Sequence, residues 1–251
     1  RKNLFFNTNL KYSLWDNFDD LYLPPVDTFP AQVRSDVKEY LNKVKDGGIL
    51  IGRAQYDYHL TPKLNHHIMA SAGIFEDMFS GAGMEYLYFK PDTNYAFGVD
   101  VFKVRKRDYS WRFGHLDYEN TLDTSNFYYR NYGTLPFDMR VSAGEYLAGD
   151  VGYTIEFSRS FYNGVQFGVF ATFTDVTREQ FGEGSFDKGL YFRVPFNGLL
   201  PGNSKNAYAT IMRPLDRDGG RRLEDFSGSL WFARRKVRYD ALVNNRARMF
   251  P

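Results

Sequence analysis

The stretch GILIGRAQYDYHL, residues 48–60, alternates between two kinds of side chain. One set is apolar or aromatic and comprises Leu50, Gly52, Ala54, Tyr56, Tyr58 and Leu60. The other set turns polar after its first member and comprises Ile51, Arg53, Gln55, Asp57 and His59. A period of two predicts an extended strand with two different faces. In a soluble sandwich the apolar face would meet a protein core, whereas in an outer-membrane barrel it would meet lipid while the polar face lines a wet lumen.

The composition is typical of a folded β protein and excludes some functions. Of the 251 residues, 43% are hydrophobic and 18% aromatic, which suits strands and also the aromatic girdles of membrane barrels. The net charge is +2 with both signs mixed along the chain, so no nucleic-acid partner is expected. Cysteine is absent, which excludes disulfides and thiolate metal sites.

Alternating segments bounded by turn residues predict about twelve strands. The chain contains no apolar run long enough for a transmembrane helix, but barrel strands carry a much weaker signal than such helices. The predicted strands cover residues 3–15, 48–61, 64–76, 80–90, 94–107, 119–131, 136–148, 151–162, 165–176, 188–197, 205–213 and 228–240.

One amphipathic helix is predicted in the long connection between the first two strands. In PAQVRSDVKEYLNKVKDGG the apolar residues Val33, Val37, Tyr40, Leu41 and Val44 form a single helical stripe. A proline at the start suits a first helical turn and the glycines at the end suit a stop. The helix is therefore expected over residues 30–46, as a plug in the lumen or a cap over the outer mouth.

The lengths of the connections favour a barrel over a sandwich. Short links such as TPKL, PDTN, GTLP and YNG follow the second, fourth, sixth and eighth strands. Longer connections follow most odd-numbered strands, with AGD after the seventh as an exception. Short turns at one end and long loops at the other are typical of outer-membrane barrels. The connections of a Greek-key sandwich are not expected to separate by length in this way. The prediction is an all-β, antiparallel transmembrane barrel whose twelfth strand closes on the first.

Several segments resemble a known family. They are LPPV and VRSDVKEYL, then SAGIFEDMFSGAGMEYLY, and later GEYLAGDVG, QFGEGSFDKG and RPLDRDGG, in that order between about residues 23 and 220. Together they are similar to the YjbH/GfcD-type outer-membrane proteins of exopolysaccharide and capsule systems. The resemblance implies a barrel in the Gram-negative outer membrane, linked to secretion or maturation of an extracellular polysaccharide. Members are longer than this chain, so residues 1–251 are expected to form the C-terminal barrel domain of a longer protein.

Two loops are candidate glycan-binding elements. In FGEGSFDKG, Phe181 and Phe186 could stack on sugar faces while Glu183 and Asp187 accept hydroxyl hydrogen bonds. A phosphate loop is not expected there, because the carboxylates would repel phosphate and a strand follows. The plainer interpretation is a loop that glycines shape and Asp187 and Lys188 tie down.

The second loop, MRPLDRDGGRRL, concentrates arginines. Arg213, Arg217 and Arg221 could bind an acidic polysaccharide in forked pairs, because a guanidinium matches carboxylate geometry. The alternative, which the sequence favours, is an internal salt-bridge network that folds the loop over the barrel mouth. On the predicted second strand, Arg53, Gln55, Asp57 and His59 are expected to face the lumen.

The sequence contains no compelling catalytic or metal site. Two of the four histidines are adjacent, so in a strand they point to opposite faces and cannot chelate one ion. Glu76 and Asp77 could in principle cut glycosides, but a solvated turn is the expected position for them. No catalytic residue, metal or cofactor is assigned.

Three functions remain open from the sequence. The preferred one is a non-enzymatic conduit, guide or scaffold for polysaccharide export, in contact with outer-membrane lipid and with periplasmic or lipoprotein components of the same system. The second is an outer-membrane enzyme that modifies or trims the polymer. The third is a soluble carbohydrate-binding β protein.

Overall fold

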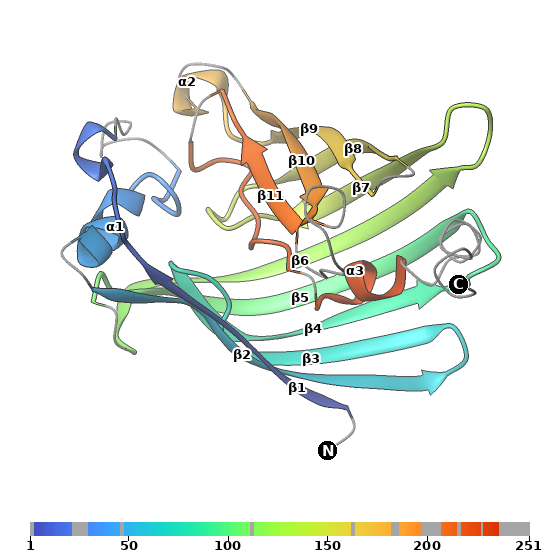
Figure 1. Cartoon of the computed structure of the whole chain (residues 1–251), viewed down its shortest axis with the longest axis horizontal. Helices are drawn as coiled ribbons and strands as arrows, with labels where there is room; N and C mark the ends of the chain where they lie inside the picture. Colours follow the sequence, from blue (N-terminus) through green and yellow to red (C-terminus); the bar gives the residue numbers. More distant parts are fainter. Residues whose placement is uncertain are drawn as a thin grey trace.

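The computed structural model describes residues 3–21, 30–45, 48–110, 113–161, 164–181, 186–196, 207–214, 217–226 and 228–235. Over these residues eleven antiparallel strands form one sheet in which each strand pairs with the next in chain order (Figure 1). The strands are β1 (Leu4–Tyr12), β2 (Ile49–Lys63), β3 (His66–Ile74), β4 (Phe79–Phe89), β5 (Tyr95–Arg107), β6 (His115–Asn131), β7 (Phe137–Glu145), β8 (Val151–Ser160), β9 (Gln166–Thr174), β10 (Asp187–Pro195) and β11 (Ala207–Met212).

These strands match the first eleven predicted from the sequence to within a few residues, but the predicted twelfth strand is wrong. The described part of range 228–240 contains a short helix, α3 (Leu230–Arg234), and its last residues lie outside the described part of the chain. Leu230 is 2% exposed and lies in an apolar cluster with strand residues, so it is buried as part of a helix instead. Within the described residues β1 and β11 are the two ends of the strand order, and no pairing between them is seen.

The helix predicted for the first connection is present but begins later than expected. It is α1 (Val37–Lys45), preceded in the same connection by a short 3-10 turn, η1 (Phe18–Asp20). Residues 33–35 stay outside the helix because their backbone N–H groups donate to the Asp218 carboxylate at 2.7–2.9 Å. The Asp218 carboxylate, distant in the sequence, thus accepts the N–H groups of residues that were predicted to form the first helical turn. None of the described helices is long and apolar enough to cross a membrane.

The two faces of the curved sheet differ in polarity, as the alternation in β2 predicts. Gln55 and Asp57 are buried on the inner face, whereas Tyr56 and Tyr58 are exposed on the outer face. The next strand continues the inner row, because Ser71 lies opposite Asp57 and donates to its carboxylate at 2.6 Å. Figure 1 shows the sheet curved so that its inner face surrounds α3.

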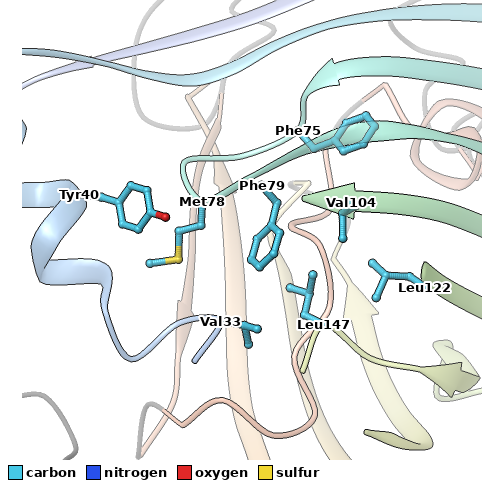
Figure 2. Packing of buried hydrophobic residues seen from close by; sticks show 8 residues of the cluster. All are labelled: Val33, Tyr40, Phe75, Met78, Phe79, Val104, Leu122 and Leu147. Carbon is cyan, nitrogen blue, oxygen red and sulfur yellow. The ribbon is translucent and has the colours of Figure 1, made fainter. Parts of the chain in front are cut away.

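Two apolar clusters fill the inner side. One lies at the end of the sheet that carries the β1–β2, β3–β4, β5–β6 and β7–β8 connections, which we call the loop end. Figure 2 shows its side chains converging from α1, the strands and the loops: Val33, Tyr40, Phe75, Met78, Phe79, Val104, Leu122 and Leu147. The other lies under α3 and comprises Met69, Leu87, Phe89, Ala96, Tyr128 and Leu230. The first connection is therefore packed onto the sheet at the loop end.

Candidate functional site

The segment that follows β11 lies along the inner face of the sheet. We call its described residues, 217–226 and 228–235, the inner segment. Arg140 on β7 pairs with Asp225 of this segment at 3.1 Å. The backbone N–H of Leu230 donates to the Glu85 carboxylate on β4 at 2.8 Å. Polar and ionic contacts thus join the inner segment to several strands.

A cavity lies between the inner segment and the sheet. It is lined by Arg53, Gln55, Phe75, Glu85, Asp100, Phe102, Leu122, Thr124, Arg140, Glu145, Arg222, Leu223, Glu224, Asp225, Phe226 and Ser229. Two of the carboxylates, Glu85 and Asp100, are direct partners across β4 and β5 and therefore share the inner face. Asn126 donates to Asp100 at 2.7 Å. The cavity combines acceptors, donors and aromatic rings, which is the set of groups that binds polyhydroxylated ligands.

The guanidinium groups that line this cavity are engaged by protein partners. Arg140 donates from Nε and Nη2 to the Asn126 carboxamide oxygen at 3.2 and 3.0 Å, besides its pair with Asp225. Arg222 donates to the Ser142 hydroxyl at 3.0 Å. Arg53 lies 4.4 Å from the centre of the Phe226 ring. The sheet and the inner segment thus position the cationic groups firmly.

The two loops that the sequence singles out do come together at the loop end. Arg213 lies 3.3 Å from the Asp187 carboxylate, which joins the start of β10 to the loop after β11. Phe181, in the short helix α2 (Arg178–Phe181), is 5% exposed and packs against Gly219, where a Cβ would lie 3.0 Å from its ring. The contacts between the loops are therefore internal to the protein.

The remaining predicted glycan-binding residues occupy different environments. Phe186 is partly exposed and stacks on Phe173 at 4.7 Å between ring centroids. Arg221 is 4% exposed and donates from Nε to the Arg217 carbonyl oxygen at 2.6 Å. Glu183 lies outside the described residues. Among the described members, Phe186, Arg213 and Arg217 are thus partly exposed, whereas Phe181, Asp187 and Arg221 are buried.

Burial shifts the pKa of two charged groups in this loop cluster. It lowers the pKa of Arg221 to about 9, and the like charge of Arg213 acts in the same direction. It also raises the pKa of the Asp150 carboxyl above its ordinary value, although the N–H of Gly220 donates to this group at 2.7 Å. In both residues burial disfavours the charged form, which indicates a packed network at the loop end.

The four polar residues predicted to face the lumen differ in burial. Gln55 and Asp57 are buried and hydrogen-bonded to each other at 2.7 Å, with Asp57 also accepting from Ser71. Arg53 and His59 are partly exposed, and the His59 ring meets Phe5 edge-on at 5.2 Å. All four follow one another along the same side of β2, so they form a polar row on the inner face.

The prediction of a solvated position is wrong for Glu76, although Asp77 is partly exposed in the β3–β4 turn, and sequence reasoning missed the carboxylates of the cavity. Glu76 is 2% exposed, not solvated, because its carboxylate forms a forked ion pair with Arg34 and accepts the N–H of Glu224 at 2.9 Å. Asp77 pairs with Lys11 at 2.6 Å. No alternation in the sequence reveals Glu85 and Asp100 as opposed carboxylates, because the other inward positions of β4 and β5 are mostly apolar residues or glycine. Within the described residues no group of three or more metal-ligating side chains is found.

Comparisons with known proteins assign the chain to a family. A family model described as "Exopolysaccharide biosynthesis protein YbjH" matches residues 1–231. A protein of Escherichia coli K12 named "Uncharacterized lipoprotein YjbH" is 33% identical over 228 residues, which cover 88% of this chain. The chain spans 32% of the length of that relative. No solved structure matches this chain. The chain therefore belongs to the YjbH family of exopolysaccharide biosynthesis proteins.

Proposed function

We propose that this chain is the outer-membrane part of a longer Gram-negative exopolysaccharide protein, and that it guides or holds the polymer during export without catalysis. In this proposal residues 1–251 form one barrel domain that is closed in the membrane, with the first connection capping its outer mouth. The observation that carries the proposal is the order of residue types across the outer face of the sheet. The relative named as a lipoprotein and the exopolysaccharide family also support a position in the Gram-negative cell envelope.

Exposed apolar side chains form a band on the outer face over β1, β2, β4, β5, β8, β9 and β11, whereas β6 presents Ser125 and Asp123 beside Val99 and Val101. Tyr56, Met84, Val99, Val101 and Val169 are each between 44% and 57% exposed although they lie within strands. Further exposed members of this band are Phe6, Tyr153, Tyr208 and Met212. A soluble protein rarely leaves so wide an apolar surface uncovered, whereas lipid is its natural partner.

Aromatic rings form a row beside this band, at the end of the sheet opposite the loop end. Phe97 lies 5.7 Å from Tyr95 and 5.2 Å from Phe127, measured between ring centroids. Phe137 continues the row, at 6.4 Å from Tyr129 and 6.1 Å from Phe157. Aromatic girdles of this kind mark the interfaces of membrane barrels, where a ring with a polar tip is favoured.

Charged side chains replace apolar ones on the outer face toward the loop end. Lys103 and Arg105 of β5 lie near Glu119 of β6, at 3.6 and 4.0 Å. The sequence of aromatic row, apolar band and charged rim is what a membrane-spanning strand presents along its length. The longer connections at the charged end would then face the cell exterior.

Placing an arginine at two depths on the outer face tests the proposal in the full-length protein. Val99→Arg introduces the charge within the apolar band, whereas Thr121→Arg introduces it beside Lys103 at the charged rim. A charge at mid-membrane should cost roughly 2–4 kcal/mol and one near the interface about 0–1 kcal/mol. We therefore expect Val99→Arg to lower the outer-membrane fraction and the exported polysaccharide, and Thr121→Arg to leave both unchanged.

The same two variants distinguish a membrane-spanning sheet from a soluble carbohydrate-binding protein. An exposed valine in water tolerates arginine well, so a soluble protein would accept both substitutions equally. Sucrose-gradient fractionation, detergent dependence and thermal unfolding of the two variants give the measurements. Equal fractionation and stability for Val99→Arg and Thr121→Arg would remove the main support for a membrane-spanning sheet.

A further inference from the structure

We infer that the cavity between the inner segment and the sheet is a saccharide-binding subsite that prefers neutral or amino-bearing sugars over uronic acids. The inference rests on the proposed function, because it names the class of glycan that the inner face would meet. Its basis is the chemistry of the side chains that β4, β5, β7 and the inner segment bring together.

Two of the carboxylates that line the cavity are directly opposed. Glu85 and Asp100 face each other across adjacent strands on the inner face, and both line the cavity. Like charges directly opposite each other destabilise a sheet. Glu85 accepts the Leu230 N–H through Oε2 and Asp100 accepts the Asn126 amide through Oδ2, so each carboxyl group has a second oxygen that these two contacts do not use. A sugar ring supplies hydroxyl donors that could satisfy both groups at once. The pair is therefore a suitable acceptor site for adjacent hydroxyls or for an ammonium group.

The lining of the cavity contains more acidic than basic residues. Five lining residues are acidic, Glu85, Asp100, Glu145, Glu224 and Asp225. Three lining residues are basic, Arg53, Arg140 and Arg222, so acidic residues exceed basic ones by two. A ligand that carries its own carboxylate would add repulsion, whereas an amino group would gain attraction.

Two of the arginines that line the cavity already donate to protein acceptors. Arg140 is held by Asp225 and by Asn126, and Arg222 donates to Ser142. Their donors are thus directed at protein acceptors, which weakens their ability to hold an incoming carboxylate in a forked pair. This feature and the excess of acidic residues both argue against an acidic ligand.

Aromatic side chains give the cavity an apolar wall that suits the carbon-bound face of a sugar. Phe226 lines the cavity, and the Arg53 guanidinium over its ring fixes its orientation. Phe75 and Phe102 add aromatic surface on the sheet side, and their rings meet edge-on at 5.4 Å. Aromatic faces beside polar groups are the usual make-up of a specific small-ligand site.

The test measures binding of three defined tetrasaccharides to the full-length protein in a detergent without sugar headgroups. The probes are β-1,4-linked tetramers of glucosamine and of glucose, and an α-1,4-linked tetramer of galacturonic acid. Isothermal titration calorimetry at low salt provides the affinities. We expect the glucosamine tetramer to bind about tenfold tighter than the galacturonate tetramer, with the glucose tetramer between them.

Two double variants connect binding to the cavity. Glu85→Gln with Asp100→Asn removes the opposed charges and should weaken glucosamine-tetramer binding about tenfold, because charge-assisted hydrogen bonds are lost. Asp117→Asn with Glu119→Gln makes the same change of charge on exposed residues of β6 and should leave the affinity unchanged. Tryptophan fluorescence of Trp231, with every other tryptophan of the full-length protein replaced by phenylalanine, reports whether the bound sugar lies next to the inner segment.

The outcomes separate this inference from the proposed function. The inference is overturned if no tetramer binds, if galacturonate binds as tightly as glucosamine, or if the β6 variant weakens binding as much as the cavity variant. Membrane insertion is judged independently by the Val99→Arg and Thr121→Arg pair. Normal insertion without saccharide binding would reject the subsite and leave the membrane proposal standing.

Discussion

The indole ring of Trp231 lies stacked on the phenol ring of Tyr128, with ring centroids 3.9 Å apart and ring planes inclined by 17°. The contact fixes α3, near the end of the chain, onto the inner face of β6. Leu230 beside it is buried in the apolar cluster under the helix. The inner segment is therefore anchored at this end by apolar contacts and further along by the ion pair between Arg140 and Asp225.

Removal of the Trp231 ring should release the inner segment. Trp231→Ala deletes the stacking contact and part of the apolar packing, which we expect to cost about 2–4 kcal/mol of unfolding free energy. Limited proteolysis should then cut within residues 217–235 faster than in the unchanged protein. Trp231→Phe retains an aromatic ring and should restore most of the protection. Equal protection of the alanine variant would mean that the polar contacts alone hold the segment.

Breaking the ion pair between Arg34 and Glu76 should loosen the first connection. Glu76→Gln leaves the Arg34 guanidinium without its charged partner in a buried place, which typically costs about 3–5 kcal/mol. Thermal unfolding and proteolysis within residues 30–45 measure the effect. The exposed pair of Lys45 and Asp19 provides the control, because solvent screens it and Asp19→Asn should leave the melting temperature nearly unchanged. Similar losses in both variants would show that burial does not strengthen the inner pair.

The strands could be predicted from the sequence because their signal is local. Alternation along β2 already separates Gln55 and Asp57 from Tyr56 and Tyr58, and the sheet keeps that separation. The start of α1 could not be predicted, since the side chain that replaces its first turn, Asp218, lies far along the chain. Likewise, a short apolar run such as the one around Leu230 does not distinguish a strand from a buried helix.

The candidate site was predictable in part, for a related reason. The loops that contain Asp187 and Arg213 were singled out by composition, and the structure brings these two residues together. Whether such residues face solvent or each other depends on packing, which composition does not reveal. The cavity residues Glu85 and Asp100 occupy ordinary alternating positions, and it is their pairing across strands that gives them significance.

The buried Asp150 carboxyl should make stability depend on pH. Because its pKa in the folded protein is raised above the ordinary value, the folded state binds this proton more tightly than the unfolded state. Its stabilising contribution is therefore present at pH below the ordinary carboxyl pKa and is lost as pH rises through the folded-state pKa. Asp150→Asn removes this dependence while its carboxamide oxygen can still accept the Gly220 N–H.

Thermal unfolding between about pH 4 and pH 7 gives the measurement, since the ordinary carboxyl pKa is about 3.9. The melting temperature of Asp150→Asn relative to the unchanged protein should rise with pH over this interval. Asp117→Asn, an exposed carboxylate on β6, serves as the comparison. If the difference in melting temperature between Asp150→Asn and the unchanged protein stays constant across this pH interval, ionisation of Asp150 does not affect stability.

The two phenylalanines of the loop before β10 should have separable effects. Phe181 is buried against Gly219, so Phe181→Ala should destabilise the loop cluster by about 3–5 kcal/mol. Phe186 is partly exposed, with Lys188 placed 4.3 Å from its ring centre, and its loss should cost much less. Thermal unfolding of the two single variants in detergent measures this contrast.

If the loop end guides a glycan, Phe186 is the ring of this pair that can reach it. Phe186→Ala should then reduce exported polysaccharide while the protein remains inserted and heat-stable, because a sugar face loses its stacking partner. Phe186→Tyr keeps the ring and should export normally. Phe181→Ala cannot decide the matter, since a fall in export would follow from the damaged loop cluster. Normal export by a stable, inserted Phe186→Ala protein would assign this loop a structural role and would direct attention to the cavity beneath the inner segment.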